Sequence, residues 1–446
     1  TYKPLQYFDC PSALMQAQLG LRDRQQYFIK RCLAATHAAV NEPEPESVDK
    51  AAASDFWRVL VVDSMGQSIV SPILSVKQLR QMGITMHMSL HSRRDRIEEA
   101  PAVYFILPNA QNIDRLCEDI KSNLYQSYYI NFITHVPREL LEKLAETVVL
   151  TGSSKLVRKV YDQYVNFICL ESDLFVLSTG DGNVSPISYY DFNSVNVKTD
   201  DQVDRIVSVM VDGLFSVLLT MDTIPFVTYP QGGMAEAVGK MIDKRLRSAL
   251  HDSANHFFTG SEAGLALGQL SFNRPLLVLV DREFDMAAPV QHVWSYQALI
   301  HDLVGTNLNK VVVSPEKSYV LGEPGDHFWM SHRGSSFPQV AEDIQHELES
   351  YRVSEQEVKR LRNVLGFSSG GEDESASTVQ FISDTTSKLN SAVSNLPQLI
   401  ERKRFLDMHT NIATCLLEII KSRQIDVLFE YEQKIMSKQD LGRPIA

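Results

Sequence analysis

The chain has 446 residues, of which 44% are hydrophobic and 22% are charged, and this length suggests about three globular domains. The formal net charge of −12 argues against general nucleic-acid binding through a basic surface. Five scattered cysteines without a C-x-x-C pair, no signal-peptide pattern and no long apolar run indicate a cytoplasmic protein without a disulfide framework, a zinc ribbon or a transmembrane segment.

The first part of the chain alternates short apolar runs with amphipathic helices. Residues 1–50 contain one short helix and a polar, proline-bearing linker. Four apolar runs of strand length follow, at 57–63, 84–90, 102–107 and 128–133. Segments with helical spacing separate these runs, and the alternation is typical of a parallel sheet covered by helices on both faces. We therefore predict a doubly wound α/β domain over 51–150.

A second α/β domain is predicted over 151–285. Three apolar runs have strand length, at 174–178, 225–230 and 275–281. Two segments between them have the apolar spacing of helices, one over 202–220 and one opened by Gly232 and Gly233.

From about residue 290 the pattern becomes mainly helical, and we predict a helical third domain over 286–446. Ser354 and Glu357 have the spacing of a capping box, which predicts that a helix begins there. The last long helical segment is apolar on more than one side, which favours burial in a helical bundle.

Residues 366–370, GFSSG, match the G-x-S-x-G pattern of a hydrolase nucleophile elbow. Such an elbow needs an apolar strand before the serine and a helix directly after it. Here a basic helical segment precedes Ser368, and the acidic, loop-like GGEDESAS follows it. We therefore interpret 366–378 as a mobile loop and not as a catalytic site.

The patterns for phosphate and metal sites also fail. Gly233 and Gly239 enclose five residues where a P-loop has four, and Met241 replaces the serine or threonine that would meet magnesium. The first βα turn carries only Gly66, so a dinucleotide fingerprint is missing. The histidines lack an H-E-x-x-H arrangement. We predict no catalytic residues, no metal and no cofactor, and an α/β hydrolase or nucleotide-dependent enzyme is the alternative.

Three charged residues, Asp281, Arg282 and Asp285, follow the apolar run at 275–281. Charges at a strand's carboxyl end can line a functional crevice, or they can form an ion-pair network that locks two domains together. The second interpretation fits better, because no nucleotide fingerprint supports the first.

Residues 278–305, VLVDREFDMAAPVQHVWSYQALIHDLVG, resemble the signature of the SM family, the Sec/Munc-type regulators of SNARE assembly, in its ER–Golgi Sly-type branch. Further similar stretches, such as WRVLVVDSMGQSIVSPILSVKQLRQMGITMHMSLHSRRD, extend the resemblance from about Leu21 to Lys438. It implies two parallel-sheet α/β domains and a helical domain in an arch, without enzymatic activity. It also implies a role in SNARE complex assembly during vesicle fusion between ER and Golgi.

The resemblance implies specific partners, and this chain differs from the family pattern at one point. The expected partners are a syntaxin (a Qa-SNARE), bound through its N-peptide and its SNARE helix, and other SNAREs of the ER–Golgi step. Through these partners the protein would be held peripherally at ER and Golgi membranes. In the family a closing segment completes the second α/β domain. We expect the third domain to be truncated here, and either the chain is a fragment or isoform or the second domain is incomplete. An unfinished sheet would expose apolar surface and an edge.

The resemblance places the syntaxin N-peptide pocket on the last helices of domain one. Two apolar stripes would form it: Leu141, Leu144 and Ala145 on one helix, and Val157, Val160 and Tyr161 on the next helix. The alternative is that both stripes belong to the core, and without the resemblance the core would be favoured.

The SNARE-templating hairpin would span 354–410 and include Leu361, Leu396, Pro397 and Leu399. Pro397 would act as a hinge, because proline removes a backbone donor and ends or kinks a helix. The loop 366–378 would then be a lid over the SNARE-binding face, with Gly366, Ser368, Gly370 and Glu372 as its candidate residues. A passive linker is the alternative for the loop, and a helical tether that binds no syntaxin peptide is a further alternative for the protein.

Deleting residues 366–377 tests the lid hypothesis. We expect the deletion to strengthen binding to the syntaxin SNARE helix, because a lid competes for the surface that it covers. A titration with a fluorescent SNARE-helix peptide measures the change, and unchanged or weaker affinity would contradict the hypothesis.

Overall fold

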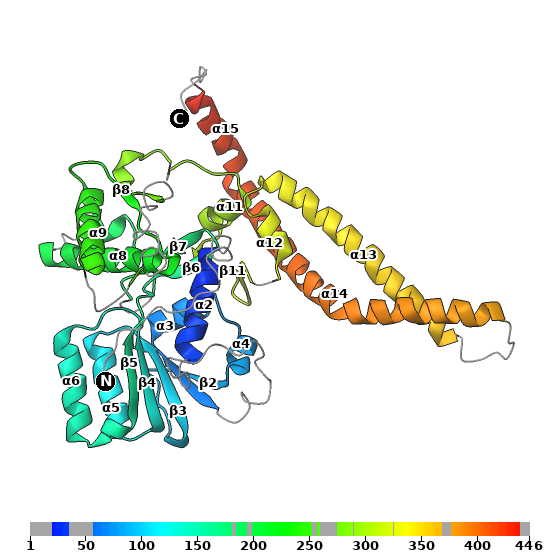
Figure 1. Cartoon of the computed structure of the whole chain (residues 1–446). Helices are drawn as coiled ribbons and strands as arrows, with labels where there is room; N and C mark the ends of the chain where they lie inside the picture. The colour runs from blue at the N-terminus through cyan, green and yellow to red at the C-terminus, as the bar shows by residue number, and fades with distance from the viewer. Residues whose placement is uncertain are drawn as a thin grey trace. The chain divides into compact units, whose positions relative to one another are not determined.

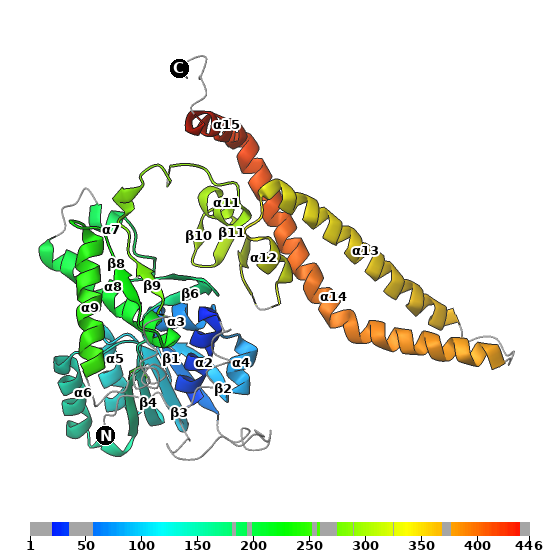
Figure 2. The same ribbon diagram turned by 45° about the horizontal axis from the view of Figure 1, so that its top comes forward.

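The computed structural model describes residues 20–34, 57–180, 184–193, 199–251, 257–258, 274–288, 290–323, 325–367 and 376–437, with the backbone alone for 193, 357–367 and 376–397. The predicted linker within 1–50 therefore lies mostly outside the described residues. The chain forms two compact units, Thr1–Phe284 and Asp285–Ala446. Figures 1 and 2 show the elements of each unit in two orientations.

Five parallel strands form the main sheet of the first unit, in the order β2-β1-β3-β4-β5. They are β1 (Arg58–Val62), β2 (Ile84–Ser89), β3 (Ile97–Ile106), β4 (Tyr125–Phe132) and β5 (Val157–Asp162). The first four confirm the predicted runs. The fifth pairs with β4, so the sheet continues past residue 150, where the first domain was expected to end.

Helices cover both faces of this sheet, as the apolar runs predicted. Figures 1 and 2 show α5 (Ala110–Lys121) and α6 (Arg138–Leu150) on one side, and α2 (Leu21–Ala34), α3 (Ser64–Val70) and α4 (Val76–Gln81) on the other. Capping side chains fix where three of these helices begin, because each accepts a hydrogen bond from a backbone amide of the first turn: Asp63 for α3, Ser75 for α4 and Asn109 for α5.

An apolar cluster, the α5–α6 core, lies between the sheet and helices α5 and α6. It includes Tyr128, Ile130 and Phe132 of β4 together with Ile113 and Leu116 of α5, all fully buried. Strand side chains alternate between faces, so these β4 residues define the side of the sheet that α5 and α6 cover.

The rest of the first unit is a second α/β layer. Its elements are β6 (Ile168–Glu171), β7 (Leu174–Val176), α7 (Tyr190–Asn193), α8 (Asp200–Met221), β8 (Phe226–Thr228), α9 (Met234–His251) and β9 (Leu276–Val278). Strands occur at all three predicted runs. However, β7 pairs antiparallel with β6, and among the described strands of this layer the parallel pair is β8–β9.

The pair β8–β9 leaves apolar side chains in solvent. Phe226, Leu276 and Val278 are 47%, 61% and 56% exposed, whereas the alternating residues Val227 and Leu277 pack against the cluster formed with α8 and α9.

The second unit is mainly helical. Its helices are α11 (Tyr296–Leu303), α12 (His327–His332), α13 (Phe337–Phe367), α14 (Ala376–Arg423) and α15 (Ile425–Met436). The helical pattern did not predict the antiparallel strands β10 (Thr306–Asn307), β11 (Lys310–Ser314) and β12 (Lys317–Val320). They are two to five residues long, too short for a clear alternating pattern.

The predicted capping box at Ser354 and Glu357 is wrong. Helix α13 already begins at Phe337, and the Ser354 hydroxyl donates to the Ser350 carbonyl one turn earlier, at 3.0 Å. Serine in a helix interior can satisfy its hydroxyl in this way, so its presence does not mark a helix start. Burial of Val340 and Ile344 against the core of this unit holds the preceding turns in the helix.

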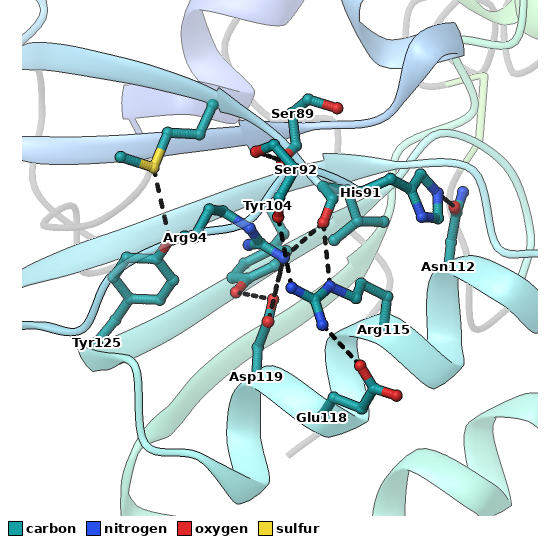
Figure 3. A network of polar contacts seen from close by, with 12 residues as sticks. Ser89, His91, Ser92, Arg94, Tyr104, Asn112, Arg115, Glu118, Asp119 and Tyr125 are labelled. Atoms are coloured by element: carbon teal, nitrogen blue, oxygen red, sulfur yellow. Dashed lines mark hydrogen bonds and ion pairs between the residues drawn. The ribbon is translucent and has the colours of Figure 1, made fainter.

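A buried ion pair fastens α5 to the loop between β2 and β3 (Figure 3). Arg94 Nη2 lies 2.8 Å from Asp119 Oδ2, and neither side chain is more than 1% exposed. The Tyr104 hydroxyl donates to the same carboxylate at 2.9 Å. Burial, and then the Asp119 charge, raise the pKa of Tyr104 well above its usual value, so this hydroxyl stays a donor. The pair stabilises only while both partners remain.

Replacing Asp119 with Ala is expected to destabilise the first unit by about 3–5 kcal/mol, because Arg94 would be left as an uncompensated buried charge. Urea denaturation followed by tryptophan fluorescence and circular dichroism measures the loss. The adjacent Glu118→Ala is the control, because its pair with Arg115 is largely exposed and is worth at most about 1 kcal/mol. Equal losses in the two variants would contradict the buried-pair argument.

Candidate functional site

The six residues predicted for the peptide pocket lie on α6 and β5, which border the same end of the sheet. On α6, Leu144 is buried in the α5–α6 core, Leu141 is half-buried against it, and Ala145 is exposed. The helical stripe is therefore partly core, as the alternative reading required, and partly accessible surface.

The second stripe was predicted on a helix, and that prediction is wrong because 157–162 is strand β5. A register shift in the pairing with β4 aligns Val157 with Tyr128 and Val160 with Ile130. Both valines accordingly pack against the α5–α6 core. Tyr161 is the next residue along the strand, so its side chain points to the opposite face, where Lys159 Nζ lies 5.8 Å from its ring centre.

The structure therefore brings five of the six residues to one side of the sheet, with half-buried Leu141, Val157 and Val160 accessible at its border. Two further apolar residues at the end of α6, Val149 and Leu150, are 74% and 78% exposed. Sequence reasoning missed them, although apolar residues directly before the polar turn TGSS are a detectable signal.

This border can offer two kinds of interaction. Apolar side chains can receive an apolar anchor from a peptide, and β5 is the last strand in the sheet order, where an extended chain can add main-chain hydrogen bonds. Around it, Arg138 pairs with Glu142 at 2.8 Å, and Lys143 pairs with Asp114 of α5, so charged groups surround the apolar surface.

The three residues predicted as an interdomain ion-pair network follow strand β9. Asp281 is half-buried and accepts a hydrogen bond from the Ala235 amide of α9 at 2.8 Å. Asp285 accepts from the amides of Ala287 and Ala288 in its own turn. Arg282 and Asp285 are exposed, and the interdomain role of the set stays a prediction.

The glycines of the P-loop-like segment serve packing. A Cβ on Gly239 would lie 2.2 Å from the Tyr229 ring, and one on Gly233 would lie 2.0 Å from Asp281 Oδ2. The Asp281 carboxylate itself takes the first-turn amide of α9, which is where a phosphate would bind in a nucleotide site. This supports the prediction that the segment is structural.

In the first βα turn, too, a carboxylate of the chain accepts the amide at the start of the helix. Asp63 accepts from the Gly66 amide at 2.7 Å, from the Leu107 amide at 3.0 Å and from Asn112 Nδ2 at 2.7 Å. A Cβ on Gly66 would lie 2.3 Å from the Phe105 carbonyl oxygen. Asp63 thus joins the ends of β1 and β3 to the starts of α3 and α5, at the point where α/β sheets commonly bind ligands.

The predicted hairpin residues lie on the two long helices α13 and α14. Leu361 is on α13, and Leu396 and Pro397 are in the interior of α14, which runs through the proline as one helix. Figure 1 shows α14 bent along its length, and an interior proline removes one helical hydrogen bond. Leu399 is half-buried.

The candidate lid falls mostly outside the described residues. Gly366 lies in the last turn of α13, which ends at Phe367, whereas Ser368, Gly370 and Glu372 are not described. A helix precedes Ser368, as the argument against a nucleophile elbow required.

Within the described part of the chain, His, Cys, Asp and Glu side chains form no cluster of three that could hold a metal. None of the helices described has the length and apolar character needed to cross a membrane.

Comparison with known proteins identifies a family and several relatives of this chain. A model of the Sec1 family matches residues 58–445. Sec1 family domain-containing protein 1 of Mus musculus is 46% identical, over 97% of this chain and 67% of that protein. Protein sly1 homolog of Drosophila melanogaster is 42% identical, over 96% of this chain and 66% of that protein.

A solved structure of Sly1p in complex with an N-terminal peptide of Sed5p superimposes with a TM-score of 0.73 at 29% identity, covering 93% of this chain and 62% of that one. The chain thus spans about two thirds of the length of the relatives that it matches.

Replacing Gly66 with Ala tests the structural role of the first βα turn. A helical Gly→Ala change normally stabilises by up to about 1 kcal/mol. Here the clash with the Phe105 carbonyl should reverse the sign and cost about 1–3 kcal/mol. Gly334→Ala is the control, because a Cβ there would meet open space. Chemical denaturation compares the two, and a stabilised Gly66→Ala protein would contradict the packing argument.

Proposed function

This chain belongs to the Sec1 family, and from that membership we propose that it binds a syntaxin-type SNARE and promotes SNARE complex assembly in vesicle fusion between ER and Golgi. The observation that carries the proposal is the Sly1p structure, which is 29% identical to this chain and holds an N-terminal peptide of Sed5p. The proposed site for the corresponding peptide is the border of α6 and β5.

The peptide would bind by an apolar anchor. Leu141, Val157 and Val160 are half-buried on the α5–α6 core, so their inner atoms are already held in place and an incoming apolar side chain would cover their outer atoms. Such preordered apolar sites lose little conformational entropy on binding, which favours recognition of a short peptide. The extended flanks of the peptide could pair with the edge of β5.

The SNARE helices would bind α13 and α14. These helices of 31 and 48 residues pack against each other, and an ion pair between Arg402 and Glu347 joins them near their base. Long paired helices offer extended surfaces for helix-in-groove recognition. The lid role of 366–378 and the hinge role of Pro397 stay predictions within this mechanism.

The proposed function involves no covalent chemistry. A nucleotide-dependent enzyme, one of the two alternatives, would use an accessible anion site at a βα turn. In both α/β layers a carboxylate of the chain accepts the helix amide there, Asp63 for α3 and Asp281 for α9. We place the protein peripherally at ER and Golgi membranes, held there through its SNARE partners.

A fluorescent N-terminal peptide of the Sed5p type tests the proposal by anisotropy titration. Saturable binding is expected, and Leu141→Lys should weaken it at least tenfold, because a charged ammonium would enter the apolar surface. Leu250→Lys is the matched control, since Leu250 is 46% exposed on α9 and should leave affinity unchanged.

Two outcomes would contradict the proposal in different ways. Absence of binding by a chain with the expected circular dichroism would overturn peptide recognition. Binding that survives Leu141→Lys would keep the function but remove the α6–β5 border as its site.

A further inference from the structure

A fully buried polar network lies at the base of α14 in the second unit. His409 of α14 has Nε2 within 3.2 Å of both carboxylate oxygens of Asp326, and its Nδ1 is 3.1 Å from the Tyr296 hydroxyl of α11. The side chains of His409 and Asp326 are 0% exposed, and Tyr296 is equally buried. The network therefore joins α11, the start of α12 and α14.

Each polar group in this network has a defined partner. Asp326 also accepts from the Trp329 amide at 2.9 Å, which caps α12. Burial, and then the Asp326 charge, raise the pKa of Tyr296, so its hydroxyl remains a donor. In the tautomer of His409 that donates from Nε2 to Asp326, Nδ1 accepts from the Tyr296 hydroxyl, and every member of the network has a partner.

The surroundings of His409 are aromatic. Its ring lies nearly parallel to Trp329, with centres 6.2 Å apart and an interplanar angle of 5°, and the Phe328 ring centre is 4.9 Å away. Apolar packing alone is non-directional, and a helix can pack its apolar stripe in more than one register. Buried hydrogen bonds are directional, and an unpaired group there is costly, so they select one register.

Register matters here because α14 extends far from this core. From His409 to Ala376 the helix covers 33 residues, or roughly 50 Å at 1.5 Å per residue. A tilt of about 10° at His409 would therefore move the far end by roughly 9 Å. A slide by one helical turn would displace every side chain by about 5 Å.

We propose that the Tyr296–His409–Asp326 network sets the register of α14 against α11 and α12, and so positions the α13–α14 hairpin for a SNARE helix. The second half rests on the proposed function. The three residues are positioning residues, since none is exposed to a partner.

The test removes the whole network while preserving the fold. A triple variant, Tyr296→Phe, Asp326→Ser and His409→Leu, leaves no buried charge, and serine keeps the α12 cap. Removing His409 alone would leave the Asp326 carboxylate buried without its main partner and would mix instability with loss of register. Glu323→Gln is the control, because Glu323 also contacts α14 through Arg404 at 2.7 Å but on the surface.

The first readout is independent of any partner. Bioorthogonal spin labels on exposed Gln398 of α14 and Lys310 of β11 report their separation by pulsed electron paramagnetic resonance. The protein with its network intact and the Glu323→Gln control should each give one narrow distribution of label-to-label distances. The triple variant should add distances that differ by about 5 Å, the rise of one helical turn. A single unchanged distribution in the triple variant would overturn the register proposal.

The second readout is binding of fluorescent peptides. The triple variant should bind the SNARE helix of a syntaxin at least tenfold more weakly and bind the N-terminal peptide unchanged. If the triple variant shows additional label-to-label distances but binds the SNARE helix with unchanged affinity, the claim that the network positions the hairpin for that helix would be overturned. If the unmodified chain binds no SNARE helix, the proposed SNARE-helix binding is wrong. The distance measurement would still test whether the network sets the register of α14.

Discussion

A parallel sheet is apolar on both faces and has to be covered on both, and the arrangement of the first unit follows from this requirement. Helices α5 and α6 take one face, and α2, α3 and α4 take the other (Figure 2). The two edge strands in the sheet order of the described residues are β2 and β5. The proposed peptide site lies at the β5 edge because core side chains are only half-covered there.

Much of this fold could be predicted because the informative patterns are local. Most of β1 and the second half of β3 are continuous apolar runs, and such runs are typical of buried parallel strands. Val157, Val160 and Tyr161 were misassigned because their spacing fits a helix face, whereas only the shifted pairing with β4 places the two valines on one side of a strand. Sequence spacing holds no information about a register shift.

The network at His409 could not have been predicted for a related reason. Tyr296 and His409 are 113 residues apart, and Asp326 and His409 are 83 apart. Nothing local distinguishes this histidine from the others, since its role depends on three elements meeting in the core. Similarly, Ser354 has the residue type and spacing of a cap, but burial of the preceding turn decided where the helix begins.

The carboxylates of Asp63 and Asp281 have a consequence for how the protein responds to metabolites. Each acts as a ligand that is covalently tethered to its own site, so its effective concentration is far above that of any free anion in the cell. A nucleotide would have to displace it and could add little binding energy. By mass action, a nucleotide at either of these two turns would therefore add little to the stability of the first unit.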